Sequence, residues 1–273
     1  MQGTRVLPVL LALAVLAGFM LHYAKKQRSP AKATTGMDPV REARAFVEKE
    51  SGLPFQSDPV PVALESEAAM RARIESHLDQ RFGPSGLAHR TRALELMGVL
   101  PPGQNLRAQF LGAEATGART WFDDLDGTLY LGPGFDPAQI PDRAALVNGL
   151  CRLLLYQHHG PLGLVSDDRW IAWRGISGGL GASVEAAYRQ AHPGEAAVPT
   201  SAETEREATL MALPIYLHGV AQFPVFEGKD FLEIPGARST ILANPPAGTD
   251  IFFREFQDVE ALRQDLERRY AAT

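Results

Sequence analysis

The chain has 273 residues, which suits one domain of about 200–230 residues with an N-terminal appendage, or two small domains. Residues 1–32 hold five basic side chains and no acidic one, so the remainder carries 22 basic against 32 acidic residues. This excess of acid argues against a nucleic acid partner, because phosphate binding needs a basic face. A single cysteine, Cys151, excludes an internal disulfide.

The N-terminal region contains an apolar, uncharged run over residues 6–21, preceded by Arg5 and followed by Lys25-Lys26. With its flanking residues the run reaches the roughly 20 residues that span a bilayer. We therefore predict a transmembrane anchor over residues 1–24, with the membrane as a partner through residues 6–21. A cleaved signal peptide is the main alternative and a buried soluble helix the third.

A polar segment, residues 25–38, is rich in Ala, Lys, Ser and Thr and is predicted to be a flexible tether. Residues 39–273 are predicted to form the globular domain. Its N-terminal half shows helical periodicity over 40–51, 66–82, 87–100 and 105–115. Residues 59–64 contain two prolines that cannot donate to a sheet, so they predict an edge strand.

A hairpin is predicted over residues 120–132, where Asp126-Gly127 separates two apolar aromatic runs. The most apolar stretch after the N-terminus follows it, Ala144–His159, and ends at Gly160-Pro161. Its length without proline predicts a buried helix, with Asp142 as N-cap.

A second long helix is expected from Asp167 or Asp168 to about Gln190. Three glycines in Ser177–Gly181 indicate either close packing of another backbone or a break. Further on, we expect a helix over 203–223 with a kink near Pro214, a turn over 226–229, an irregular loop over 237–248 and a docking helix near the C-terminus. These elements predict an α+β, mostly helical fold.

Four pieces, in this order, resemble a bacterial family of zincin-type metallopeptidases, whose members are usually exported or membrane-anchored. They are Gly52-Leu-Pro-Phe55 with the Pro-Val strand, the hairpin Trp121–Tyr130, the central helix, and the pair Tyr216-Leu-His-Gly219 and Ser239-Thr240. The family's helix reads Leu-Val-His-Glu-Leu-Thr-His, against Leu146-Val-Asn-Gly-Leu-Cys-Arg152 here. The resemblance implies a zincin-like two-helix core flanked by a small sheet or hairpin.

The zincin chemistry does not carry over to this chain. A zincin needs two histidines four residues apart on one helix face, a glutamate beside the first, and a third ligand on the next helix. The matching positions hold Asn148, Arg152, Gly149 and Gly178. An arginine repels a cation and a neutral amide is a poor zinc ligand, so the resemblance implies a pseudoenzyme with no metal and no cofactor.

Arg152 is the sharpest candidate residue, because an unpaired arginine on a buried helix is costly. One hypothesis places its guanidinium at the former metal position, paired with Asp123 or Asp124, where it either fixes the vacated cleft or offers an anion site. The simpler interpretation is a structural, salt-bridged arginine. Cys151 beside it is a reactive thiol or, more simply, an apolar filler. Other residues expected to line the cleft are Tyr216, Ser239 and Thr240.

These observations predict a membrane-tethered, catalytically inactive domain that binds a protein or peptide. One alternative is an active hydrolase with an unrecognised metal site near His158 and His159. Another is a purely structural helical domain, in which the helices carrying Asn148 and Gly178 do not face each other. The resemblance implies a single-pass protein of the bacterial inner membrane with a periplasmic domain, although the positive charge after the run would favour the cytoplasm.

Overall fold

The computed structural model describes residues 39–57, 62–193, 199–236 and 238–253, together with residues 261, 264 and 268. The described residues belong to one compact unit, Asp38–Thr273. The expected anchor and tether lie outside the described residues, as does most of the expected C-terminal helix, of which Ala261, Gln264 and Arg268 are helical. Within the described part of the chain, no helix has the length and apolarity that crossing a membrane requires.

Four helices form the N-terminal half, as the periodicity predicts. They are α2 (Pro39–Ser51), α3 (Glu67–Phe82), α4 (Gly86–Leu96) and α5 (Leu106–Ala115). Two begin at side-chain caps: Ser66 Oγ accepts from Ala69 N–H, and Asn105 Oδ1 accepts from Ala108 N–H. Each cap satisfies a backbone donor that the helix itself leaves free.

The sheet has three strands in the order β1–β3–β2. The predicted hairpin is confirmed: β2 (Thr120–Asp123) pairs antiparallel with β3 (Thr128–Leu131). Strand β1 (Val62–Leu64) pairs parallel with β3 and lies at the edge, as the prolines predict, although residues 58–61 are outside the described part.

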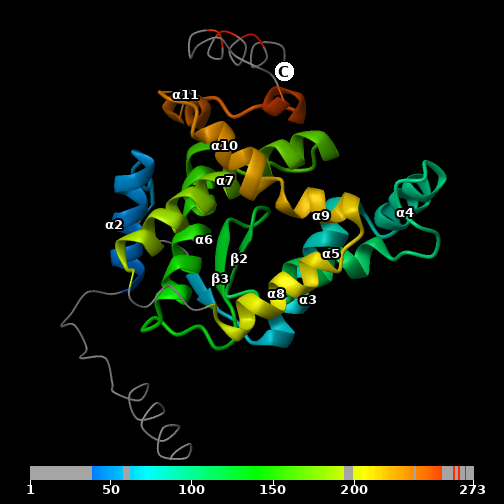
Figure 1. The fold of residues 1–273 in the computed structure, drawn as a ribbon, viewed down its shortest axis with the longest axis horizontal. Coiled ribbons are helices and arrows are strands. Elements are labelled where there is room, and N and C mark those ends of the chain that lie inside the picture. The colour runs from blue at the N-terminus through cyan, green and yellow to red at the C-terminus, as the bar shows by residue number, and fades with distance from the viewer. Residues whose placement is uncertain are drawn as a thin grey trace, which may run out of the picture. The chain divides into compact units, whose positions relative to one another are not determined.

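Helices α6 (Ile140–His159) and α7 (Asp167–Ala191) pack directly against each other, and α2 packs against α6. Figure 1 shows these three helices on one side of the hairpin, with α3 and α5 on the other. The expected N-cap at Asp142 is wrong, because the helix already begins at Ile140. The Asp142 carboxylate is fully buried and instead binds Arg119, because a buried carboxylate needs a charged partner.

Helix α7 is continuous through its glycines, so of the two alternatives the close-packing one holds. The backbone of a short π-helix, η1 (Pro224–Gly228), lies against Gly175 and Gly179. A Cβ at Gly179 would collide with that backbone, and a Cβ at Gly175 would collide with the rings of Phe223 and Phe252. Glycine removes both collisions at the cost of some helix propensity.

The C-terminal third departs from several sequence predictions. Pro214 ends α8 (Ser201–Met211) and starts α9 (Ile215–Gln222), so it separates two helices and does not merely kink one. The expected turn over 226–229 is helical, in η1 and α10 (Lys229–Leu232). The expected irregular loop contains α11 (Arg238–Ala243), and η2 (Thr249–Phe253) follows it.

The sheet separates two hydrophobic cores. On one side, Leu129 of β3 packs with α2, α6, α7 and the C-terminal helices. On the other side, its neighbour Tyr130 and Trp121 of β2 pack with α3, α4 and α5. Successive strand residues point to opposite faces, so one hairpin contributes to both cores and fixes α6 relative to α3.

Candidate functional site

Asn148 and Arg152 lie one helical turn apart on the face of α6 that meets α7. Asn148 Nδ2 donates to Glu185 Oε2 at 2.9 Å, and a Cβ at Gly181 would lie 2.7 Å from Asn148 Oδ1. A Cβ at Gly178 would lie 3.4 Å from Arg152 Nη2. The two helices therefore face each other at the positions singled out from the sequence, contrary to the expectation attached to a purely structural domain.

Packing accounts for both glycines at these positions. A Cβ at Gly149 would lie 2.5 Å from Leu129 Cδ1 on β3, and a Cβ at Gly178 would lie 2.6 Å from Pro224 Cβ. Neither position has room for the glutamate or the metal ligand that a zincin would carry there without movement of its neighbour.

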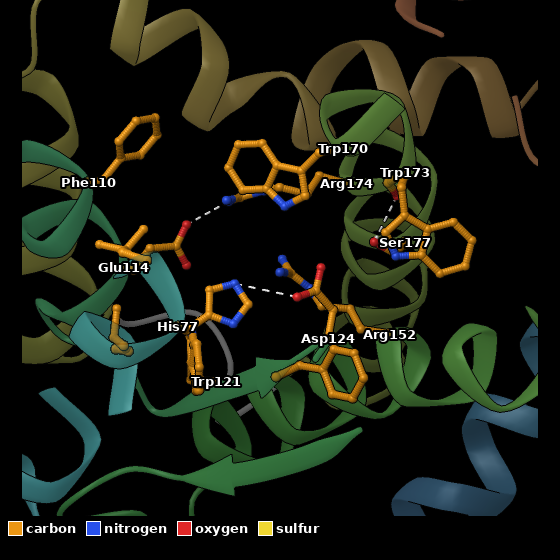
Figure 2. Close-up of a pocket in the computed structure, with 13 residues that line it drawn as sticks. His77, Phe110, Glu114, Trp121, Asp124, Arg152, Trp170, Trp173, Arg174 and Ser177 are labelled. Atoms are coloured by element: carbon orange, nitrogen blue, oxygen red, sulfur yellow. Dashed lines mark hydrogen bonds and ion pairs between the residues drawn. The ribbon is translucent and has the colours of Figure 1, made fainter. Parts of the chain in front are cut away.

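Arg152 carries a guanidinium that no described residue neutralises directly. Its Nε is covered and has no hydrogen-bond partner, and the residue forms no ion pair within the described ranges. Figure 2 shows its guanidinium in the middle of a pocket, between the Glu114–Arg174 pair and the His77–Asp124 pair. Burial and the nearby Arg174 lower the pKa of Arg152 to about 10, so it remains charged at neutral pH.

The expected pairing of Arg152 with the hairpin carboxylates is wrong, because Asp123 and Asp124 bind His77 and Arg81 instead. His77 Nδ1 lies 3.0 Å from Asp123 Oδ1, and His77 Nε2 lies 3.4 Å from Asp124 Oδ1. Arg81 Nη2 lies 2.9 Å from both oxygens of Asp124. Burial raises the pKa of Asp123, but the hydrogen bond from His77 and backbone N–H groups outweigh it and leave that pKa below its ordinary value.

His77, Asp123 and Asp124 are the one group of three buried ligand-type side chains close enough to share an ion among the described residues. Histidine and carboxylate are suitable ligands for zinc. However, both ring nitrogens of His77 face carboxylate oxygens, and Arg81 adds a positive charge beside Asp124. The geometry fits an ion-pair network that joins α3 to the hairpin better than it fits a metal site.

The remaining carboxylates around Arg152 are also paired with other arginines. Arg174 binds Glu114 at 2.7 Å, and Arg189 binds Glu185 at 2.9 Å. Burial raises the pKa of Glu114, but Arg174, Arg206 and Arg152 outweigh burial and lower it to about 2. Arg152 therefore contributes to the field at Glu114 without forming a contact with it.

Two adjoining cavities meet at Arg152. The smaller, about 40 Å³, is lined by residues that include His77, Asp124 and Trp170. The larger, about 270 Å³, lies between β2, α6, α7 and α8. Its charged lining residues are Arg119, Arg152, Arg174, Arg189, Arg206, Glu114, Asp142, Glu185 and Glu203.

Of the other residues expected to line the cleft, only Asp124 lines one of these two cavities. Tyr216 lines an apolar groove beside α4, α5 and α7. Ser239 and Thr240 lie on α11, and neither lines the two cavities at Arg152. Asp124 lines the smaller cavity, whereas Asp123, bound to His77, lines neither.

The two adjacent histidines at the end of α6 point to different segments. His158 Nε2 lies 2.8 Å from Pro54 O, and His159 Nε2 lies 2.7 Å from Leu242 O. A carbonyl oxygen only accepts, so each Nε2 carries a proton and is unavailable to an ion. Cys151 is fully buried, and burial together with Glu185 raises the pKa of its thiol, which makes it an apolar filler.

No protein-family model, curated protein or solved structure matches this chain. The resemblance to zincin-type metallopeptidases therefore stays a prediction.

Sequence reasoning missed most of the charged partners at the site. His77 alone had a local signal, since it lies on the inward face of α3 with Ile74 and Leu78. Arg81, Glu114 and Arg174 meet their partners only through tertiary packing, and nothing in their own segments indicates it.

Proposed function

We propose that this chain is a membrane-tethered, catalytically inactive metallopeptidase-like domain that binds a protein or peptide through the cavity at Arg152. The observation that carries the proposal is the unpaired guanidinium of Arg152 where α6 faces α7. A permanent positive charge at this point opposes a metal cation, and Asn148 beside it is committed to Glu185.

The cavity supports binding more than chemistry. Its charged lining residues are arginines and ion-paired carboxylates, which bind and orient polar ligands. No histidine, cysteine or serine belongs to the described lining of the larger cavity. Each of its four carboxylates is paired with an arginine, and the hydroxyls of its two threonines, Thr120 and Thr200, are hydrogen-bonded to Ala145 O and Glu203. Its size, close to the lower end of ordinary ligand pockets, suits one or two residues of a peptide.

The first experiment measures metal content and activity together. The full chain, purified without chelator, should contain far less than one zinc per chain and should not cleave peptides. One zinc per chain, with a peptidase activity that a chelator abolishes, would contradict the proposal. The two measurements test the same point, because a working zincin holds a zinc ion and loses its peptidase activity without it.

A second candidate function is a metal-dependent hydrolase centred on His77, Asp123 and Asp124, favoured by their proximity. The variant His77→Gln separates the two. In the pseudoenzyme it changes stability and leaves metal content unchanged, whereas in the hydrolase it removes the metal.

The proposed location, the bacterial inner membrane with the domain in the periplasm, rests on the apolar run 6–21 and on the resemblance. A C-terminal reporter that is active only in the periplasm should be active when fused to the full chain. Activity of a reporter that works only in the cytoplasm would instead place the domain in the cytoplasm. A pull-down from membranes with the tether intact, with the Arg152→Gln variant as comparison, then identifies partners that depend on the cavity.

A further inference from the structure

We infer that the larger cavity is a receptor for a single carboxylate group, held by Arg152 and Arg206. This inference rests on the proposed function, since it names the chemical class of the ligand that the inactive domain binds.

Two of the five arginines that line the cavity have no carboxylate partner among the described residues. Arg119 is bound to Asp142, Arg174 to Glu114, and Arg189 to Glu185. Arg152 and Arg206 form no hydrogen bond or ion pair within the described part of the chain. Both lie close enough to Glu114 for their charges to lower its pKa. Two unpaired guanidinium groups therefore line one cavity.

Arg152 has donors in the cavity that no described residue satisfies. Its Nε is covered by protein, whereas its two Nη groups are not covered and form no hydrogen bond within the described part of the chain. A carboxylate in the cavity can accept two parallel hydrogen bonds from the two Nη groups of one guanidinium. The site is thus built with the donor in place and the acceptor supplied from outside.

The charge of the lining favours a monoanion over a phosphate. Five arginines and four carboxylates give a net charge of one positive unit. One carboxylate neutralises this excess, whereas a phosphate dianion would bring two negative charges among Glu114, Glu185 and Glu203. Apolar side chains such as Trp121, Phe122 and Val225 also line the cavity and suit an organic carboxylate more than an inorganic ion.

The carboxylate can come from a peptide's C-terminus or from a small organic acid, and the test separates the two. The probes are N-acetyl-trialanine with a free carboxylate, the same peptide as its amide, acetate, and inorganic phosphate. Each is titrated into the full chain at fixed ionic strength by calorimetry, and the Arg Nε–Hε signals are followed by ¹⁵N NMR. The signal of Arg152 is assigned from its loss in Arg152→Gln.

The carboxylate peptide should bind saturably and shift the Arg152 signal, while the amide should not. Arg152→Gln and, independently, Arg206→Gln should each weaken its binding by about tenfold or more, since charge-assisted hydrogen bonds are lost. The matched control is Arg107→Gln, an arginine in an exposed pair with Asp79, which should bind like the unaltered chain. Acetate binding as tightly as the peptide assigns the site to small organic acids.

Equal binding of the peptide and its amide, tighter binding of phosphate, or unchanged affinity in Arg152→Gln each overturns the inference. Zinc content on the same sample keeps the two proposals apart. A zinc-free chain that fails to bind carboxylate loses this inference and keeps the inactive domain. A zinc-loaded, chelator-sensitive peptidase loses the proposed function whatever the titration gives.

Discussion

Arg81 Nη2 lies 2.9 Å from both carboxylate oxygens of Asp124, in a pair whose arginine side chain is only 3% exposed. This pair joins α3 to the hairpin. It also occupies the carboxylate of Asp124, one of the two that were expected from the sequence to pair with Arg152. The unpaired state of Arg152 follows in part from it, because Asp124 already lies against Arg81 and His77.

Breaking the Arg81–Asp124 pair should destabilise the fold. Arg81→Met leaves a buried carboxylate with one fewer partner, and we expect a loss of about 3 kcal/mol in the free energy of unfolding. Urea denaturation of Arg81→Met, Asp124→Asn and the double variant measures the coupling. The exposed pair Arg107–Asp79 is the control and should couple by less than about 1 kcal/mol. Equal coupling in the two pairs would show that burial does not strengthen the first.

Two arginines of the same cavity should respond to methionine with opposite sign. Arg152→Met removes an unpaired, half-buried charge and should raise the free energy of unfolding by roughly 1 kcal/mol. Arg174→Met leaves Glu114 without its hydrogen-bonded partner and should lower it by about 2 kcal/mol. Urea unfolding without added carboxylate checks both, and a destabilised Arg152→Met would mean that Arg152 has a partner.

Acid should destabilise the protein through Glu114. Its folded-state pKa, about 2, lies below its ordinary value of 4.5, so the unfolded state binds more protons between these values. The stability that Glu114 contributes is complete above about pH 4.5 and is lost as the pH falls towards 2, in total on the order of 3 kcal/mol. The midpoint of urea unfolding, measured from pH 6 to 2.5, should therefore fall less steeply in Glu114→Gln. Parallel curves for the two proteins would contradict the assignment.

Alanine at three helical glycines should distinguish close contact from open space. Gly149→Ala and Gly178→Ala place a Cβ against Leu129 and Pro224 and should destabilise by about 1–3 kcal/mol. Gly219→Ala in α9 meets nothing within 4 Å and should stabilise by about 0.5–1 kcal/mol through helix propensity. Thermal melts of the three variants give the comparison, and stabilisation at all three would show that the helices have room to separate.

Much of the fold follows from local patterns in the sequence. Ser66 and Asn105 cap the helices that they precede, because a side-chain acceptor at that position meets a backbone donor of the same segment. The turn at Asp126-Gly127 likewise depends on neighbouring residues, with Gly127 at a φ of 72° that favours glycine. The errors fall where distant contacts decide, as at Asp142, which binds Arg119 and does not cap its helix.

For the candidate site, the sequence predicted which residues of the two helices face each other but not which side chains pair there. The facing of Asn148, Arg152 and Gly178 was expected from a resemblance that no comparison supports. The partners were not predictable, because Arg81 and Asp124 are 43 residues apart and Arg174 and Glu114 are 60 apart. A guanidinium pairs with whichever carboxylate the packing brings near, and the local sequence does not indicate which one that is.

The parallel pairing of β1 with β3 has a consequence for the order in which the chain folds. Val62 meets Leu129, 67 positions later, whereas the turn between β2 and β3 is formed by adjacent residues. The entropy lost in closing the longer loop must be recovered by α3, α4 and α5, which lie within it. The hairpin can therefore form early, and β1 joins only after those three helices have packed. The amides of β1 should accordingly be the first of the sheet to exchange with solvent.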